Sequence, residues 1–256
     1  MNNSTNKNLN SRFWSEFQNF ADIRKKFWNS EYDKGSSRIG NYYKRAVKDI
    51  VQNSIPKGST VLELGCGSGE LLNALSPNIG VGIDFSAVAI SRARSSHKHL
   101  RFYEIDVHEL SQIETKLFSF DFIILSDLVN ELWDVQLVFS SIQRYCGPNT
   151  RILINYHSNL WNMPLTFLRK IGFLRPRLIQ NWLTPEDMEN LLSISGFEVI
   201  RKQQEILIPV YIPYASNLIN RYLGRIWPFR LLNITNFLVA RPSISLTVKP
   251  PPLFLA

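Results

Sequence analysis

The 256-residue sequence predicts an α/β fold built on a doubly wound, seven-stranded and mostly parallel sheet. Short apolar runs rich in β-branched residues alternate with amphipathic stretches through the middle third of the chain. A tight glycine-rich turn follows the first of these runs, and an acidic residue ends the second. This order is typical of βαβ units, in which a helix connects two parallel strands.

The expected strands cover residues 60–64, 81–84, 100–105, 120–125 and 151–156, and two further strands at 198–207 and 234–240 complete the sheet. Helices are expected between them at 70–75, 86–95, 108–113 and 131–145. Pro148 predicts a turn before the fifth strand. Thr184 as an N-cap and Pro185 at the first helical position predict another helix, which ends at about Ser195.

The chain is predicted to divide into four parts. A disordered tail covers residues 1–10, an aromatic helical segment 11–59, a core domain 60–242 and a C-terminal tail 243–256, with insertions in the core domain near 158–183 and 206–233. Phe13, Phe17 and Phe20 have helical spacing, which predicts packing against the sheet. A lid over the substrate is the alternative function for this segment.

Charge is distributed unevenly along the chain. Residues 1–60 carry a net charge of +6, residues 61–157 carry −4 and residues 158–256 carry +6, which sum to +8. An acidic centre between basic flanks favours a cationic cofactor in the middle and anionic partners at the ends, with a solvated basic surface as the alternative. Cys66 and Cys146 form neither a disulfide framework nor a zinc ligand set, so no metal and a reduced cytoplasmic setting are expected. The polar N-terminus and the absence of about 18 consecutive apolar residues predict neither a secretory signal nor a spanning helix.

The glycine turn, residues 65–69 with the sequence Gly-Cys-Gly-Ser-Gly, lets the backbone approach a ligand closely. Position 70 is Glu, whereas a dinucleotide fingerprint has glycine or alanine there, and a carboxylate would repel a pyrophosphate. Asp84, at the end of the second strand, is placed to accept hydrogen bonds from both hydroxyls of a ribose. Glu63 adds negative charge. These features favour an adenosyl group that carries positive charge, which is the chemistry of S-adenosylmethionine.

Residues 61–69, 81–86, 102–107 and 120–134 resemble, in order and spacing, successive motifs of the class I S-adenosylmethionine-dependent methyltransferases. The resemblance implies a Rossmann-like fold and S-adenosylmethionine as cofactor. The glycines would border the methionine moiety, Asp84 would hold the ribose and Phe85 would lie by the adenine, whose amino group and edge would meet Asp106 and Val107. The cofactor-binding residues implied are Glu63, Gly65, Cys66, Gly67, Gly69, Asp84, Phe85, Asp106, Val107 and Ser126.

Two residues are candidates for the catalytic role. Methyl transfer is an in-line displacement that depends mainly on alignment, and a general base is needed only when the acceptor must lose a proton. His157 follows the fifth strand, at the edge where open α/β sheets bind ligands, and an imidazole suits proton transfer near neutrality. A loop histidine bonded to backbone is the alternative. On the same resemblance, Ser126 and Asp127 stand at the methionine end, where Asp127 would orient the acceptor.

A narrower resemblance relates the chain to a group of bacterial methyltransferases that accompany glycosyltransferases of the polyprenyl-phosphate-sugar type. The residues that carry it are Trp161, 180–187, 196–199, Ile208-Pro209, Ile212-Pro213, Asn220-Arg221 and Ala240-Arg241-Pro242. It implies a glycosyltransferase partner and a context in surface glycan or lipid-linked sugar metabolism, but no particular substrate. The expected function is methyl transfer to an oxygen atom of a small or lipid-linked acceptor. The expected location is cytoplasmic, with peripheral contact at the inner membrane surface.

Other functions remain as alternatives. A non-catalytic interaction protein would keep the fold without turnover, and a nicotinamide-dependent oxidoreductase is disfavoured by Glu70. A nucleic-acid methyltransferase is disfavoured because residues 126–129 lack the Asn/Asp-Pro-Pro-Tyr/Phe motif, although the basic flanks suit phosphates. Residues 206–256 hold five Lys/Arg and no acid, and Arg221 and Arg225 alternate with apolar residues. Ordinary packing on the sheet accounts for this pattern, and contact with anionic lipid is the alternative.

Overall fold

The computed structural model describes residues 3–34, 38–112, 119–174 and 177–243. Seven strands form one sheet in the order β3-β2-β1-β4-β5-β7-β6, and β7 runs antiparallel to both of its neighbours. The predicted seven-stranded, mostly parallel sheet is therefore confirmed. The strands are β1 (Thr60–Leu64), β2 (Ile79–Asp84), β3 (Arg101–Glu104), β4 (Phe120–Ser126), β5 (Cys146–His157), β6 (Phe197–Glu205) and β7 (Thr235–Pro242).

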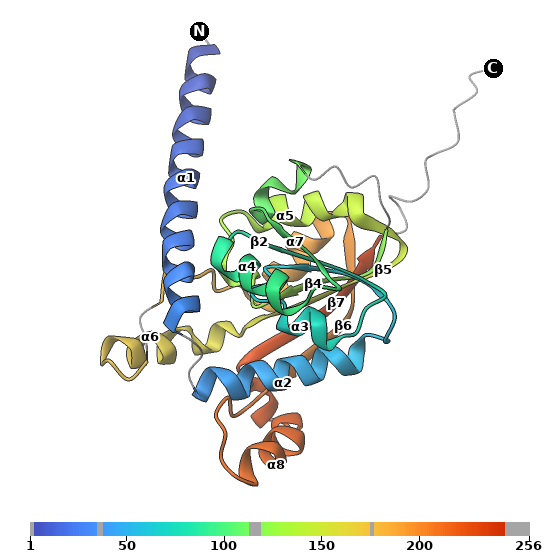
Figure 1. Ribbon diagram of the computed structural model, residues 1–256. Coiled ribbons are helices and arrows are strands. Elements are labelled where there is room, and N and C mark those ends of the chain that lie inside the picture. The colour runs from blue at the N-terminus through green and yellow to red at the C-terminus, as the bar shows by residue number, and fades with distance from the viewer. Residues whose placement is uncertain (1–2, 35–37, 113–118, 175–176, 244–256) are drawn as a thin grey trace, which may run out of the picture.

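Helices lie on both faces and at one edge of the sheet (Figure 1). They are α1 (Asn3–Lys34), α2 (Arg38–Ser54), α3 (Glu70–Ala74), α4 (Ala87–Ser96), α5 (Val135–Ile142), α6 (Asn162–Lys170), α7 (Pro185–Ile194) and α8 (Ala215–Arg221). No helix within these described ranges is both long enough and apolar enough to cross a membrane.

The core consists of two apolar layers, one on each face of the sheet. Successive strand residues point to opposite faces, so Val61 packs with Val47 and Val51 of α2, whereas Leu62 packs with Phe139 of α5 on the other face. Both layers are fully buried at β1. This double coverage holds the carboxyl ends of β1, β2, β4 and β5 in fixed register along one edge.

Capping side chains determine where two helices begin. Thr184 and Asp187 form the capping box that begins α7, with hydrogen bonds of 3.1 and 2.9 Å, so the predicted start of this helix is confirmed. The helix expected at 131–145 is wrong at its start. Asp134 accepts a hydrogen bond from the backbone N–H of Leu137 at 2.8 Å, and this N-cap begins α5 at Val135.

Two other expectations differ from the structure. The tail expected to be disordered at residues 1–10 is helical from Asn3, because extending an existing helix costs far less than starting one. The turn expected at Pro148 lies inside β5, where the register with β4 shifts between Phe120 and Phe122. Of the predicted C-terminal tail, residues 244–256 lie outside the described residues, as does the last residue of the helix expected at 108–113.

Both insertions lie at the same end of the molecule (Figure 1). The first carries α6, and the second carries α8 together with the short helical turns Leu223–Arg225 and Phe229–Leu232. The Trp161 indole, from the turn before α6, donates a hydrogen bond of 2.9 Å to the Leu232 carbonyl. This bond joins the two insertions directly.

Candidate functional site

The glycine turn lies between β1 and α3, at the carboxyl edge of the sheet. Gly65, Gly67 and Gly69 have φ values of 69°, 53° and 77°, which residues with a Cβ rarely adopt. The Gly67 N–H donates to Asp84 Oδ2 at 2.9 Å, and the Ser86 N–H donates to Asp84 Oδ1 at 2.8 Å. These bonds fix the Asp84 carboxylate against the turn. Each of its oxygens keeps a further acceptor position for a ligand.

Glu63 lies buried in β1, beside this turn. Burial raises the pKa of Glu63 to about 8, with a smaller contribution from the charge of Asp84 and an opposing hydrogen bond from the backbone of Leu72. Its Oε2 atom has no hydrogen-bond partner among the described residues. A buried carboxylate oxygen without a partner, next to a turn built for close approach, fits a ligand that carries an ammonium group.

The Cys66 thiol, expected to border the ligand, packs in the apolar core. A Cβ on Gly82 of β2 would lie only 2.7 Å from its Sγ atom, which shows how closely the sulfur meets the strand. Burial raises the pKa of this thiol far above its ordinary value. Cys66 therefore contributes its backbone to the turn.

Helix α1 brings the Tyr32 hydroxyl to the same turn. A Cβ on Gly67 would lie 2.5 Å from Tyr32 Oη. Burial raises the pKa of Tyr32 well above its ordinary value, and the charges of Asp84 and Glu63 raise it further. The phenol therefore stays protonated, and it lies where the sequence predicted the methionine part of the cofactor.

Polar contacts hold α1 over the carboxyl edge of the sheet. The Arg92 guanidinium donates to the Tyr32 carbonyl at 2.6 Å, and Ser86 Oγ lies 2.5 Å from Asn29 Oδ1. Lys25 forms an ion pair of 2.9 Å with Glu104 at the end of β3. The helix thus covers the ends of the strands instead of packing flat on a face of the sheet. Of the two expectations for residues 11–59, packing on the sheet holds for α2, whereas the position of α1 favours a lid.

Arg24 connects α1 to the other half of the cleft. Its buried guanidinium donates to the Glu131 carbonyl at 2.8 Å and to the Ile179 carbonyl at 2.5 Å, and it lies 3.9 Å from the centre of the Phe20 ring. The Arg24 Nε atom also lies 3.6 Å from Glu131 Oε2. One side chain therefore links the cover helix to both the β4 loop and the first insertion.

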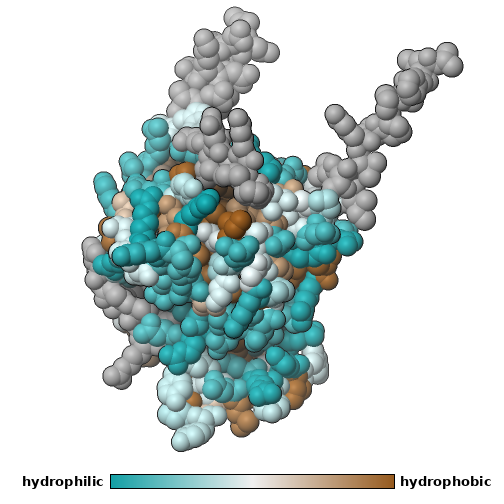
Figure 2. Space-filling model, turned by 45° about the vertical axis from the view of Figure 1, so that its right-hand side comes forward, coloured by the Kyte–Doolittle hydropathy of each residue, from teal (hydrophilic) through white to brown (hydrophobic). Residues whose placement is uncertain are grey.

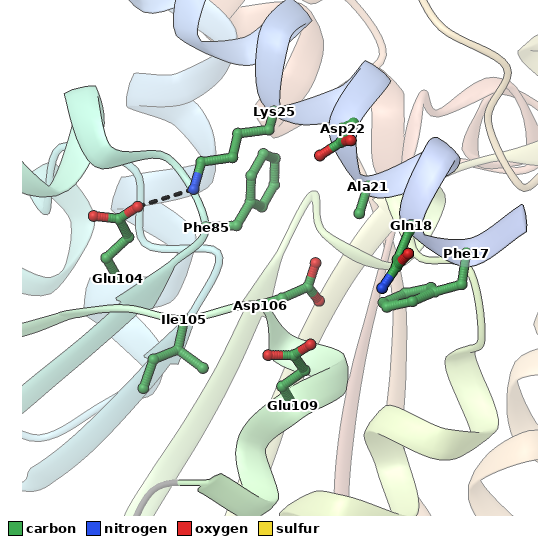
Figure 3. A pocket seen from close by; sticks show the side chains of 10 residues that line it. All are labelled: Phe17, Gln18, Ala21, Asp22, Lys25, Phe85, Glu104, Ile105, Asp106 and Glu109. Atoms are coloured by element: carbon green, nitrogen blue, oxygen red, sulfur yellow. Dashed lines mark hydrogen bonds and ion pairs between the residues drawn. The ribbon is translucent and has the colours of Figure 1, made fainter. Parts of the chain in front are cut away.

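A cavity of about 440 Å³ lies between α1 and the ends of β2 and β3 (Figure 3). Phe85 and Asp106, both predicted to meet an adenine, line it opposite α1. The remaining lining residues are Phe17, Gln18, Ala21, Asp22, Lys25, Glu104, Ile105 and Glu109. Its volume is within the range of small-molecule sites. Val107 lines a smaller adjoining cavity of about 30 Å³, which shares Phe85 and Asp106 with the larger one.

His108 orients Asp106 in this cavity. Its Nδ1 atom lies 2.6 Å from Asp106 Oδ1, and its backbone N–H donates to the same oxygen at 2.9 Å. His108 Nε2 accepts from the Asp134 N–H at 3.2 Å, which assigns the proton of the neutral ring to Nδ1. Burial alone would raise the pKa of Asp106, but the bonds from His108 and the charge of Lys25 bring it below its ordinary value. Asp106 is thus an ionised acceptor facing the cavity.

A second polar cluster lies after β4 and involves α2. Asp127, directly after Ser126, has a φ of 52°. Tyr43 Oη and Asn155 Nδ2 both donate to Asp127 Oδ1, each at 2.7 Å. Burial raises the pKa of Tyr43 well above its ordinary value, and the charge of Asp127 adds to this effect. The cluster therefore contains a carboxylate whose two donors fix its orientation.

His157 ends β5 beside this cluster. Its ring centre lies 5.7 Å from that of Tyr43 and 6.3 Å from that of Trp182. The backbone N–H of His157 donates to Asn130 Oδ1 at 3.0 Å, but its ring atom Nδ1 is buried without a partner in the described part of the chain. A loop histidine with a purely structural role would bond the protein through its ring. In His157 the backbone N–H makes the hydrogen bond instead, and the ring atom Nδ1 remains available to a ligand.

Electrostatics keep this imidazole neutral. Burial lowers the pKa of His157, Asp127 raises it, and Arg177 and Arg169 lower it further. The net pKa lies below the ordinary value of about 6.5. At neutral pH the ring therefore carries one proton and one free lone pair, as a general base requires.

Four residues of the site were not predicted from the sequence: Tyr32 and Tyr43 from the N-terminal segment, Asn155 inside β5, and Arg24. Arg24 bonds residues that are 107 and 155 positions away in the sequence, and Tyr43 bonds one that is 84 positions away. A pattern of neighbouring residues cannot predict such contacts. One signal was available. A buried tyrosine needs a hydrogen-bond partner for its hydroxyl, whereas a buried phenylalanine does not, so the tyrosines of the aromatic segment indicated polar contacts.

The glycine turn, the acid that ends β2 and the cavity beside β3 together define a class I S-adenosylmethionine-dependent methyltransferase. The chain belongs to the family described as "Methyltransferase domain", which matches residues 37–202. S-adenosylmethionine is the methyl donor of this class. The partnerless Glu63 oxygen and the glycine cradle fit that donor.

Two curated relatives match parts of the chain. A probable polyketide synthase 23 of Dictyostelium discoideum is 31% identical over 150 residues, which are 48% of this chain and 6% of the relative. A 2-phytyl-1,4-naphtoquinone methyltransferase of Thermosynechococcus vestitus is 36% identical over 72 residues, 25% of this chain and 31% of the relative. The chain thus matches less than a third of either relative's length.

Solved structures share the fold over most of the chain. Magnesium protoporphyrin IX methyltransferase from Synechocystis PCC 6803 with bound SAH gives a TM-score of 0.60 at 17% identity and covers 88% of this chain and 100% of its own. An S-adenosylmethionine-dependent methyltransferase from Methanosarcina mazei gives 0.56 at 17% identity, with 76% and 97% covered. At this identity the likeness concerns the fold alone.

Proposed function

We propose that the protein transfers a methyl group from S-adenosylmethionine to an oxygen atom of a small or lipid-linked acceptor. The observation that carries this proposal is the cluster at the carboxyl ends of β4 and β5. There Asp127 Oδ1 accepts from Tyr43 and Asn155, and the partnerless Nδ1 of a neutral His157 lies beside them. A hydroxyl acceptor must lose a proton during transfer, and this ring is placed to take it.

On the donor side, the predicted residues receive the following roles. Glu63 and the glycine turn hold the methionine part, Asp84 accepts from the ribose hydroxyls, and Phe85 packs on the adenine. Asp106 and Val107 meet the adenine amino group and edge, and Ser126 lies at the methionine end. When bound, S-adenosylmethionine supplies a methyl carbon that its sulfonium has already activated. The protein therefore needs to align the reactants and exclude water, and alignment supplies most of the catalytic effect.

On the acceptor side, His157 accepts the hydroxyl proton as the new O–CH₃ bond forms and the C–S bond breaks, so sulfur keeps the bonding electron pair. Asp127 has one oxygen fixed by Tyr43 and Asn155. Its other oxygen accepts a hydrogen bond from a second hydroxyl of the substrate. This hydrogen bond would orient the reacting oxygen. Trp182 provides an apolar wall next to the imidazole.

A lipid-linked acceptor is supported by two observations. One relative is named for 2-phytyl-1,4-naphtoquinone, a molecule with a long isoprenoid chain. Residues 180–187, which carry part of the resemblance to glycosyltransferase-associated methyltransferases, include Trp182 at the site. We further propose that the protein acts in the cytoplasm at the inner membrane surface, beside a glycosyltransferase of the polyprenyl-phosphate-sugar type.

The test uses methyl-labelled S-adenosylmethionine, the purified protein and an extract of the source organism, followed by partition into organic, aqueous and macromolecular fractions. We expect base-stable label in the organic fraction or, for a small acceptor, in the aqueous fraction. His157→Ala is the matched control, because it should bind the donor and transfer little label.

Other outcomes would contradict the proposal. Label in nuclease-sensitive macromolecules would indicate a nucleic-acid methyltransferase. Donor binding without transfer into any fraction would indicate an interaction protein that keeps the fold.

A further inference from the structure

The first insertion exposes apolar side chains to solvent. Met163, Phe167 and Ile171 follow one another at intervals of four residues, so they share one face of α6, and the Met163 side chain is 82% exposed. Ile179, further along the insertion, is 91% exposed. The opposite side of α6 faces the protein, because Leu165 packs against the core. The exposed face of α6 therefore has no partner within the described chain.

The second insertion exposes a similar set. Tyr214 and Trp227 are 97% and 75% exposed, and Leu218, Tyr222 and Ile226 are exposed as well. The hydrogen bond from Trp161 to Leu232 joins this insertion to the first. Figure 2 shows hydrophobic side chains among polar ones at the lower end of the molecule, where Figure 1 places α8. We call the exposed residues of the two insertions the apolar end.

The charges of the apolar end all have one sign. Residues 158–183 contain four Lys/Arg, residues 206–233 contain three, and neither stretch contains Asp or Glu. The stretch 61–157 that precedes them carries a net charge of −4, whereas residues 1–60 carry +6, so the insertions and the N-terminal segment share the positive charge of the chain. Clusters of aromatic, aliphatic and cationic side chains without acids match the headgroup region of an anionic bilayer.

We propose that the two insertions form one membrane-docking surface that binds an anionic lipid bilayer. The exposed aromatic and aliphatic side chains enter the boundary between headgroups and acyl chains. Arg221, Arg225 and Arg230 lie near lipid phosphates. The protein rests on the bilayer through this surface without crossing it.

The docking surface also borders the acceptor side of the site. Helix α6 begins five residues after His157, and the segment that ends at Trp182 closes the first insertion beside the same ring. Arg169 of α6 and Arg177 make no hydrogen bond or ion pair to the described residues, so both are available to an anionic headgroup that approaches His157. An amphiphilic acceptor could thus enter from the bilayer. The inference rests on the membrane location in the proposed function and names the surface responsible, and docking can be measured without methyl transfer.

The test is sedimentation of the full chain with vesicles at low salt. We expect binding to vesicles of phosphatidylcholine and phosphatidylglycerol, at least fivefold weaker binding to phosphatidylcholine alone, and release from anionic vesicles as salt screens the arginines. Phe167→Ser with Trp227→Ser, and separately Arg221→Gln with Arg225→Gln, should each reduce the bound fraction at least fivefold. Vesicles with brominated acyl chains should quench Trp227 fluorescence, which is measured as the difference from Trp227→Phe.

Matched controls come from exposed residues away from the insertions. Ile194→Ser with Ile200→Ser, and Lys57→Gln with Arg144→Gln, should bind vesicles like the unaltered protein. All variants should keep donor affinity, which shows that they are folded. Equal binding by the Phe167/Trp227 variant, or no binding to anionic vesicles, would overturn the proposal. A dimer in solution that these substitutions convert to monomer would also overturn it, because the surface would then be an interface between two copies.

Discussion

Tyr32 and Gly67 meet where helix α1 crosses the glycine turn. The Tyr32 hydroxyl lies 2.5 Å from the point that a Cβ at position 67 would occupy. The glycine therefore serves two contacts, one with the cover helix and one with the ligand that this turn is built to approach. Because both cannot use the same space, we expect the end of α1 to move when the donor binds as proposed.

Gly67→Val should abolish measurable donor binding. The branched side chain would fill the space over the turn, and a φ of 53° strains any residue with a Cβ by about 1–3 kcal/mol. Adding Tyr32→Ala should recover part of the lost thermal stability, since it removes the clash, but little of the affinity. Calorimetric titration and thermal melts separate the two effects. Normal affinity in a folded Gly67→Val protein would show that the turn is structural only.

Asp84→Ala should weaken donor binding by at least about 1.5 kcal/mol, because two ribose hydroxyls lose a charged acceptor in a buried cleft. It should also lower the melting temperature, since the Gly67 and Ser86 N–H groups lose their partner. Asp121→Ala is the matched control, because Asp121 accepts from the Thr60 backbone N–H and hydroxyl near the opposite edge of the sheet. The control should cost stability and leave the affinity unchanged. Unchanged affinity for a folded Asp84→Ala protein contradicts the cofactor assignment.

Glu63 should make donor affinity depend on pH. With a pKa of about 8 in the free protein, this carboxyl is mostly protonated at pH 6, whereas a cationic ligand binds its ionised form. Affinity should therefore rise from pH 6 through pH 8 and level off only about one unit above this pKa. Glu63→Gln should remove the dependence. Titrations at several pH values that show a flat profile for the unaltered protein would contradict this role.

The same carboxyl should also make the stability of the free protein depend on pH. Its folded pKa of about 8 exceeds the ordinary value of 4.5, so the folded state holds a proton that the unfolded state has lost between these values. The free energy of unfolding should fall as pH rises through this window, by about 1.4 kcal/mol per unit of pKa difference. Glu63→Gln should therefore stabilise the protein more at pH 8.5 than at pH 5. Melts that show no such difference would place the pKa of Glu63 near its ordinary value.

His157→Ala should lower turnover about 100-fold or more while changing donor affinity little, provided that the acceptor is a hydroxyl. Because the pKa of His157 is lowered, kcat should fall with decreasing pH only below about 6.5. Tyr43→Phe should reduce kcat less, since it removes one donor to Asp127 and keeps the imidazole. His99→Ala, on an exposed loop, is the control that should change nothing. Full turnover by His157→Ala would transfer the role to Asp127 or remove the need for a base.

The strands and the donor side were predictable because their signals are local. A buried parallel strand appears as a short apolar run, and β1 matches its predicted range at both ends. The glycine turn and the acid that ends β2 are separated by one helix, so their proximity follows from the βαβ unit alone. The hydrogen bond between Gly67 and Asp84 is the direct result.

The acceptor side was only partly predictable because its contacts are distant in sequence. His157 and Asp127 follow strands, and the fold brings strand ends together. Tyr43 reaches Asp127 from a helix in the N-terminal segment, and periodicity says which face of that helix is apolar but not where the helix lies. The early start predicted for α5 failed for a different reason, since a single capping aspartate, Asp134, overrides the propensity of the residues before it.

We expect Arg24 to set the order in which the enzyme binds its substrates and releases its products. Its guanidinium holds two carbonyls at once, one in the β4 loop and one at Ile179, three residues before the Trp182 wall of the acceptor site. We therefore expect any movement of α1 toward or away from the donor to move the acceptor wall with it. Turnover should follow a compulsory sequence in which the donor enters first and its demethylated product leaves last, with the opening of one helix limiting the rate.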